Sequence, residues 1–242
     1  MQHTWIFLTL FLSAALAQGQ ALTAKQARAA YDAADRDLNA AWAAAKKALP
    51  ETEFNVLKEE QRAWVEHRDY LARSPMYTGA AAQGELSLDA PEYLEAAAGL
   101  AEMRTNWLMG LIRESNDDSL TGVWTDSYGS HIDIVEYEGR VHFVMECVRG
   151  PTSHIGGLAG IAVWNPPIGW FSDKGREAGK EDETNLSFHL RGRKLEVIGA
   201  NTGHYHGARA YFDGAYVKVQ ALNAKAQAKI VKAAKLGEVP EH

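Results

Sequence analysis

The sequence is poor in cysteine, and that shortage excludes a disulfide framework. Among 242 residues there is one cysteine, Cys147, so the chain cannot form an internal disulfide and must be stabilised by burial of a core. Cys147 shares the alternating phase of Phe143 and Met145. We therefore expect it to be a buried, unreactive thiol rather than a nucleophile.

The N-terminal segment has no charged side chains, and its apolar run is short. Residues 1–17 carry no Lys, Arg, Asp or Glu, and the apolar run at residues 5–12 is too short to span a bilayer comfortably. Ala15-Leu16-Ala17 fits a signal-peptidase site, so we predict a signal peptide that is cleaved after Ala17, with an uncleaved anchor as the alternative. No cysteine follows the run, which excludes the lipid anchor of a bacterial lipoprotein.

Signatures of catalysis and of nucleic-acid binding are also absent. The sequence has no G-x-S-x-G elbow, no P-loop and no dinucleotide fingerprint, and no acid/base pair is singled out by its context. The formal net charge of −6 argues against nucleic acid as a partner and suits a protein that meets a basic one. We predict a protein that is not an enzyme and needs no cofactor.

Residues 23–113 have the apolar periodicity of three helices. Thr23 and Gln26 form a capping box that begins the first helix, which ends at Pro50. The second helix follows at once and extends to about residue 71, so the pair should form an antiparallel hairpin. Residues 74–90 indicate a loop, and Asp89 before Pro91 is the expected cap of a third helix ending near residue 113.

One face of the second helix combines apolar and polar side chains. Offsets of four, seven and eleven residues place Leu57, Gln61, Trp64 and Arg68 on one stripe. A buried amide or guanidinium needs a partner, and the i, i+4 pair of Asp35 and Asn39 on the first helix can supply one. We predict that Gln61 and Arg68 tie the second helix to the first or third. The alternative is simple core packing for the aromatic side chains and structural ion pairs or amide contacts for the arginines.

This stripe, preceded by Asp35-x2-Leu38-Asn39-x2-Trp42, resembles the N-terminal domain of the LprI-type lysozyme inhibitors, and the third helix matches their pattern at Arg104 and Leu108. The resemblance implies an exported bacterial protein, periplasmic or secreted, whose partner is a lysozyme or another envelope protein. Such relatives usually carry cysteines around these helices, which this chain lacks. The candidate binding residues that the resemblance marks are Asp35, Asn39, Trp42, Gln61, Trp64, Arg68 and Arg104.

From residue 120 the apolar period changes to two. Hairpin turns are indicated at Glu138-Gly139 and Arg191-Gly192, and residues 210–216 predict a last strand. Short strands and Gly-rich turns favour a small antiparallel barrel or sandwich. Residues 150–156 and 212–218 resemble the β domain of some LprI relatives, which have cysteines where this chain has Asn185 and Thr202.

Three weaker patterns leave alternatives open. His204 and His206, if on a strand, would share a face and form half of a metal site, but His142 and His189 lie opposite the apolar phase of their strands as solvated residues would, and we predict no metal. A β region that holds a small molecule or glycan near Trp124, Trp164 and Trp170 is the alternative function. The basic tail, with Lys225, Lys229 and Lys232, suggests a solvated helix or one that touches anionic lipid.

The predicted fold is α+β, with an N-terminal antiparallel three-helix domain, a small antiparallel β-barrel or sandwich, and a short C-terminal helix. The expected boundaries are 1–17 for the signal peptide, 18–116 for the helical domain, 117–219 for the β domain and 220–242 for the basic C-terminal helix or tail. After signal cleavage the chain should have no stable membrane anchor.

Overall fold

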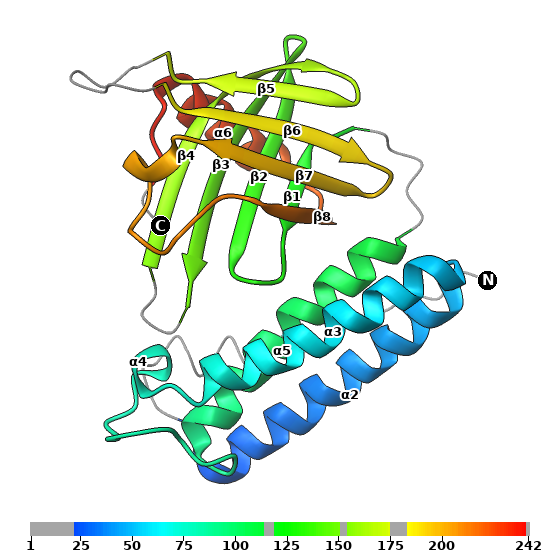
Figure 1. Ribbon diagram of the computed structural model, residues 1–242, viewed down its shortest axis with the longest axis vertical. Coiled ribbons are helices and arrows are strands. Elements are labelled where there is room, and N and C mark those ends of the chain that lie inside the picture. Colours follow the sequence, from blue (N-terminus) through cyan, green and yellow to red (C-terminus); the bar gives the residue numbers. More distant parts are fainter. Residues whose placement is uncertain (1–21, 114–118, 151–153, 175–182, 241–242) are drawn as a thin grey trace.

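A computed structural model describes residues 22–113, 119–150, 154–174 and 183–240. It confirms the α+β class: long helices lie side by side along one side of the molecule, and a β-barrel stands on them (Figure 1). The signal-peptide prediction concerns residues outside the described part of the chain. The N-terminal helices are α2 (Ala24–Ala48), α3 (Glu51–Ala72), the short α4 (Pro75–Thr78) and α5 (Pro91–Ile112).

The helix ends follow their capping chemistry. The capping box of Thr23 and Gln26 is present at the start of α2, and Pro50 separates α2 from α3. The expected cap of the third helix was wrong, because the N-cap of α5 is Ala90 and Asp89 instead forms an ion pair with Arg28 of α2. The segment 74–90, predicted as a loop, contains the single turn of α4.

The β region is a closed barrel of eight strands in which each strand pairs antiparallel with the next and β8 pairs with β1. This result decides between the barrel and the sandwich. Glu138 and Gly139, the predicted hairpin turn, both have positive φ angles of 51° and 71°, as a tight turn between twisted strands requires. The strands are β1 (Gly122–Thr125), β2 (Ser130–Tyr137), β3 (Arg140–Arg149), β4 (His154–Asn165), β5 (Ile168–Ser172), β6 (Asn185–Arg191), β7 (Lys194–Ala200) and β8 (Gly214–Gln220).

Two features of the barrel differ from the sequence prediction. The last strand begins at Gly214, and residues 210–213 approach it as an irregular segment that buries Ala210 and Phe212. Strands β4 and β5 were not predicted: glycines interrupt the apolar alternation of β4, and β5 has only five residues. At Gly160 an added Cβ would lie 2.3 Å from the Phe171 ring, so β4 uses glycine to admit an aromatic side chain of β5.

Interlocked aromatic side chains fill the barrel interior. Phe143 meets Phe171 edge-on with ring centroids 5.2 Å apart, and Phe188 lies at the same centroid distance from Phe143. The predicted burial of Cys147 is confirmed, since 1% of the residue is exposed within this core. Burial raises the pKa of its thiol, which lowers the fraction of reactive thiolate.

The low reactivity of Cys147 remains a prediction. A thiol reagent should label the native protein only as fast as the barrel opens, and it should label the urea-unfolded protein completely within minutes. Mass spectrometry of both samples counts the modified thiols. Complete labelling of the native form within minutes would show that the side chain is accessible.

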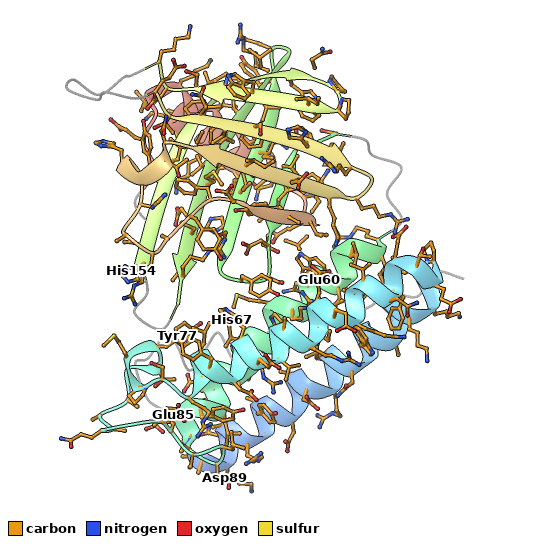
Figure 2. All side chains as sticks on the ribbon, viewed as in Figure 1. Glu60, His67, Tyr77, Glu85, Asp89 and His154 are labelled. Atoms are coloured by element: carbon orange, nitrogen blue, oxygen red, sulfur yellow. The ribbon has the colours of Figure 1, made fainter. Side chains whose placement is uncertain are left out.

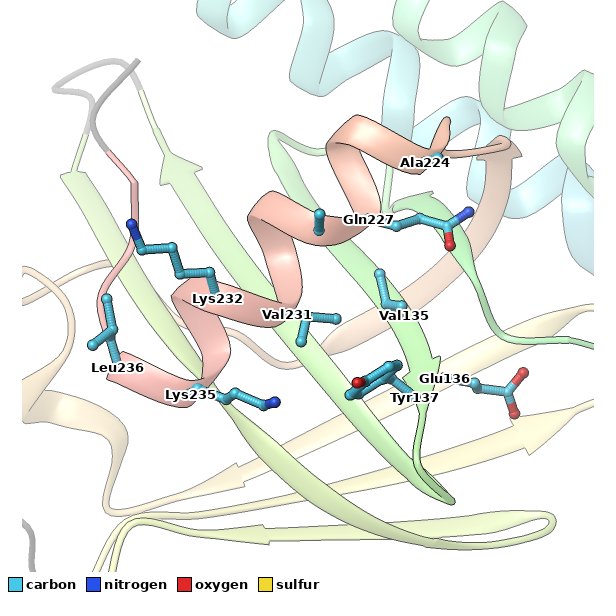
Figure 3. Close-up of a pocket in the computed structure, with 10 residues that line it drawn as sticks. Val135, Glu136, Tyr137, Ala224, Gln227, Val231, Lys232, Lys235 and Leu236 are labelled. Atoms are coloured by element: carbon cyan, nitrogen blue, oxygen red, sulfur yellow. The ribbon is translucent and has the colours of Figure 1, made fainter.

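The C-terminal helix α6 (Ala224–Leu236) covers the outer face of β2, β3 and β4, where Ile230 and Ala233 pack against Val144. Because of this cover, His142 is only 2% exposed, so the expectation of a solvated histidine there was wrong. The expected solvated face of the helix is present, since Lys225, Lys229 and Lys232 are all exposed. A groove of about 540 Å³ remains between α6 and β2, with Tyr137 and Lys235 in contact across it (Figure 3).

The barrel rests on α5 through a close backbone contact. Gly110 of α5 is buried, and a Cβ added there would lie 2.7 Å from the carbonyl oxygen of Lys218 in β8. The neighbouring Val217 of β8 is fully buried within the core of the helices. Glycine at position 110 therefore allows the helix and the strand to touch.

Replacing Gly110 with Ala should destabilise the protein by about 1–3 kcal/mol, because the overlap with β8 exceeds what small shifts can relieve. Gly99 is the matched control in the same helix, since a Cβ added there would meet no neighbouring atom within 4 Å beyond the helix backbone itself. Gly99→Ala should stabilise by about 0.5–1 kcal/mol through helix propensity alone. Urea unfolding of both variants measures the difference, and equal effects would contradict the close contact.

Candidate functional site

Arg104 of α5 packs against the predicted stripe of α3, with its guanidinium 5.7 Å from the centroid of the Trp64 ring. It is fully buried, its Nε donates to Gln61 Oε1 of α3 at 2.9 Å, and its Nη1 donates to Ser127 Oγ at 2.9 Å. The guanidinium also lies over the Trp107 ring, 4.4 Å from its centroid. Gln61 therefore ties the second predicted helix to the third, as expected. The contact with Ser127, in the turn between β1 and β2, extends the same network to the barrel.

Arg68 uses a different partner from the one predicted. Its Nε and Nη2 both lie 2.9 Å from Asp69 Oδ1, and that oxygen also accepts a hydrogen bond of 3.1 Å from the Tyr93 hydroxyl of α5. Arg68 is therefore linked to the third predicted helix through its neighbour Asp69. The suggestion that Asp35 or Asn39 would supply the partner was wrong, because Asn39 Nδ2 donates to the carbonyl and side-chain oxygens of Asp35 within α2.

The candidate residues divide by exposure. Trp64 and Arg104 are fully buried and Arg68 is 9% exposed, so these three hold the helices together and have little surface to offer a partner. Trp42 is half-buried against Phe54 of α3, with ring centroids 4.8 Å apart. Among the remaining candidates, Asn39 is exposed and Asp35 and Gln61 are half-buried.

Burial and the neighbouring Asp69 carboxylate raise the pKa of Tyr93 to about 12. An unfolded tyrosine ionises near pH 10, so between about pH 10 and 12 only the unfolded state loses this proton and folding stability falls. Tyr93→Phe should cost about 0.5–1.5 kcal/mol at neutral pH through the lost hydrogen bond. The advantage of the native protein over this variant should shrink above pH 10. Urea unfolding at about pH 8 and about pH 10.5 tests this, and an unchanged difference would contradict it.

A cavity of about 180 Å³ lies where the helices meet the barrel. The α3 residues Glu60 and His67 face the barrel across this junction (Figure 2), and the His67 ring lies 5.2 Å from that of Tyr128. Two exposed residues, Tyr211 and Ala215, are part of its wall. The residues that line the cavity are Glu60, Trp107, Asp126, Tyr128, Arg149, Tyr211, Asp213, Gly214 and Ala215.

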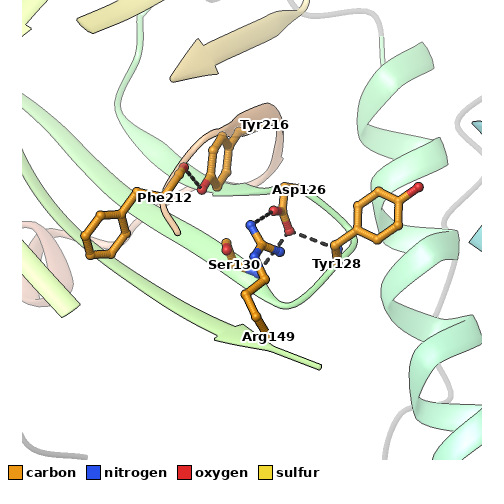
Figure 4. Close-up of polar contacts among 6 residues, drawn as sticks. All are labelled: Asp126, Tyr128, Ser130, Arg149, Phe212 and Tyr216. Atoms are coloured by element: carbon orange, nitrogen blue, oxygen red, sulfur yellow. Dashed lines mark hydrogen bonds and ion pairs between the residues drawn. The ribbon is translucent and has the colours of Figure 1, made fainter. Parts of the chain in front are cut away.

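A buried ion pair forms one wall of this junction cavity. Arg149 Nη2 donates to Asp126 Oδ2 at 2.6 Å, and Asp126 Oδ1 accepts the backbone N–H groups of Tyr128 and Ser130 at 2.9 Å each (Figure 4). The Arg149 guanidinium also lies over the Tyr211 ring, 4.4 Å from its centroid. Asp126 thus shapes the β1–β2 turn and positions Arg149 at the end of β3.

Several polar atoms at the junction have no hydrogen-bond partner among the described residues. They include Arg104 Nη2, Trp107 Nε1 and both Nε and Nη1 of Arg149. Burial lowers the pKa of Arg104 to about 10, with Glu60 acting in the opposite direction, so the guanidinium stays charged at neutral pH. Sequence reasoning found Arg104 but missed Asp126 and Arg149, because one lies in a turn and the other at a strand end, outside any motif.

Among the described residues, the histidines and tryptophans considered in the sequence analysis do not come together to form a metal or ligand site. Residues Thr202–His204 form a 3-10 helix instead of a strand, and His206 Nε2 lies 2.9 Å from Thr202 Oγ1. Within the described residues no group of three or more His, Cys, Asp or Glu side chains is arranged to hold a metal ion. Trp124 lies in the barrel core, whereas Trp170 is 53% exposed on the outer surface.

These features define an α+β protein in which three long helices carry an eight-stranded up-and-down barrel. Residues 13–108 match the family model described as "Lysozyme inhibitor LprI". The N-terminal helical region therefore matches the LprI family model, as the sequence pattern predicted, and the match ends before the barrel. No curated protein and no solved structure matches the chain. None of the helices in the described ranges is long and apolar enough to cross a membrane.

Proposed function

We propose that this protein is exported, to the periplasm or beyond the bacterial cell, and acts there by binding a lysozyme or another envelope protein without catalysing a reaction. The observation that carries the proposal is the LprI family match across the helices. The net charge of −6 supports it, since an acidic protein is steered toward a basic enzyme by long-range attraction.

An exposed stripe on α3 is the surface best suited to this partner. Val56, Glu59, Ala63, Glu66 and Tyr70 recur at helical spacing and are all exposed, with Val56 at 64% and Tyr70 at 60%. Two acidic side chains between an aliphatic and an aromatic one combine charge complementarity with apolar anchors, and tyrosine is enriched at binding hot spots. This α3 stripe lies within the residues that match the family model. The buried residues Trp64, Arg68 and Arg104 hold in place the helix that presents it.

A ligand inside the barrel is less well supported. Such a ligand would have to displace the packed rings of Phe143, Phe171 and Phe188. Trp124, which the alternative placed near a ligand, donates its indole N–H to the Leu120 carbonyl oxygen within the core. We therefore favour protein binding through the helices.

Lysozyme activity in the presence of the purified protein tests the proposal. We expect inhibition at low salt, with an association rate that falls as salt rises from about 50 to 200 mM because screening weakens the steering. Full lytic activity at a several-fold molar excess of the protein, at low salt, would exclude lysozyme as the partner.

Two charge variants locate the surface. Glu66→Lys changes the α3 stripe, and Glu238→Lys makes the same charge change at an exposed position beyond α6. We expect Glu66→Lys to slow association and weaken inhibition much more than Glu238→Lys does. Tyr70→Ala should weaken inhibition by faster dissociation with little change in melting temperature. Equal effects of the two charge variants would mean that the partner binds elsewhere.

A further inference from the structure

The junction cavity has an excess of buried donors on one side. Arg149 is 6% exposed and Trp107 is 1% exposed, both line the cavity, and three of their nitrogen atoms have no acceptor among the described residues. Arg104, behind the Trp107 ring, has one more such donor in its Nη2. Guanidinium and indole N–H groups in this setting match a carboxylate, which accepts several charge-assisted hydrogen bonds.

The cavity also has carboxylates of its own, and their partners differ. Asp126 is bound by Arg149, but Glu60 Oε2 accepts no hydrogen bond from the described residues, and its ion-pair partner, Lys194 Nζ, is 3.5 Å away. Asp213 Oδ1 accepts the Gly199 N–H at a long 3.2 Å. These two carboxylates would repel a simple anion and attract an ammonium group.

The charges of the junction balance. Arg149, Glu60, Asp126 and Asp213 line the cavity itself. Arg104 and Lys194 lie beside it against the Trp107 ring and bring the total to three charges of each sign. An occupant of either net sign would therefore meet as much repulsion as attraction. A neutral occupant with separated charges can use both sets of groups.

We infer that the junction cavity binds a small zwitterion of the α-amino-acid class. Its carboxylate is received by Arg149 and the Trp107 indole N–H, and its ammonium group by Glu60 and Asp213. The rings of Trp107, Tyr128 and Tyr211 contact a short side chain. A volume of about 180 Å³ equals that of roughly six water molecules, which is enough for a small amino acid.

Calorimetric titration of the full-length protein tests this with three probes. L-Alanine carries both charges, acetate carries only the carboxylate, and methylamine carries only the ammonium group. We expect saturable binding of alanine, at least about tenfold tighter than either single-charge probe, and a rise in melting temperature with alanine alone.

Variants separate binding in the cavity from binding elsewhere. Trp107→Phe keeps an aromatic ring but removes the N–H donor and should weaken alanine binding about fivefold to tenfold. Ala215→Phe narrows the cavity from an exposed position and should abolish binding. Ala221→Phe adds the same ring at an exposed position that does not line the cavity, and it should bind alanine like the native protein.

Each contrary result is decisive. Acetate or methylamine binding as tightly as alanine would overturn the zwitterion assignment in favour of a simple ion site. Absence of saturable binding up to about 50 mM alanine would overturn the assignment of the cavity to a small amino acid. Equal loss of binding in Ala215→Phe and Ala221→Phe would place the alanine site elsewhere. Lysozyme inhibition is measured separately, so either proposal can fail without the other.

Discussion

The structure depends on the burial of one guanidinium, that of Arg104. A buried charge is costly unless its donors are satisfied, and Arg104 satisfies two of them with Gln61 of α3 and Ser127 of the β1–β2 turn. A single side chain of α5 thus connects a second helix and the barrel. The backbone contact at Gly110, further along the same helix, fixes α5 against β8. These two contacts act together with the hydrogen bonds from Arg113 to the Val219 carbonyl and from Arg193 to the Leu111 carbonyl to fix the barrel on the helices.

The sequence revealed those parts of the fold that local chemistry determines. The capping box at Thr23, the break at Pro50 and the positive-φ turn at Gly139 all act over a few residues, and each was found where expected. The closure of the barrel could not be predicted from the sequence, because β4 has glycines at positions where apolar side chains would mark a strand. These glycines make room for side chains of other elements, such as Phe171 beside Gly160. Burial of His142 was missed for a related reason, since α6 covers a strand face whose alternation alone indicates exposure.

In the candidate site, too, only the contacts that follow from local sequence patterns could be predicted. Periodicity placed Gln61 on the correct face of its helix, and the contact with Arg104 follows once α3 and α5 are neighbours. The partner of Arg68 was not predictable by that logic, because Asp69 is its immediate neighbour and adjacent helical residues point in different directions. Tyr93 of α5 donates to the same carboxylate oxygen, and this contact links the pair to the third predicted helix. Asp126 and Arg149 are 23 positions apart, and only the strand pairing of β2 with β3 brings them together.

Because Trp64, Arg68 and Arg104 are buried, the residues that stabilise the helices differ from those that can contact a partner. Each of these three residues makes a specific contact with another helix or with a neighbouring side chain, and such contacts tolerate little change. The α3 stripe of Val56, Glu66 and Tyr70 has no comparable constraint, since exposed positions can change at small cost to stability. The family pattern is therefore evidence for a helical scaffold, and the choice of partner depends on side chains that the pattern leaves free. On this argument, proteins that share the buried stripe can bind different partners without altering the fold.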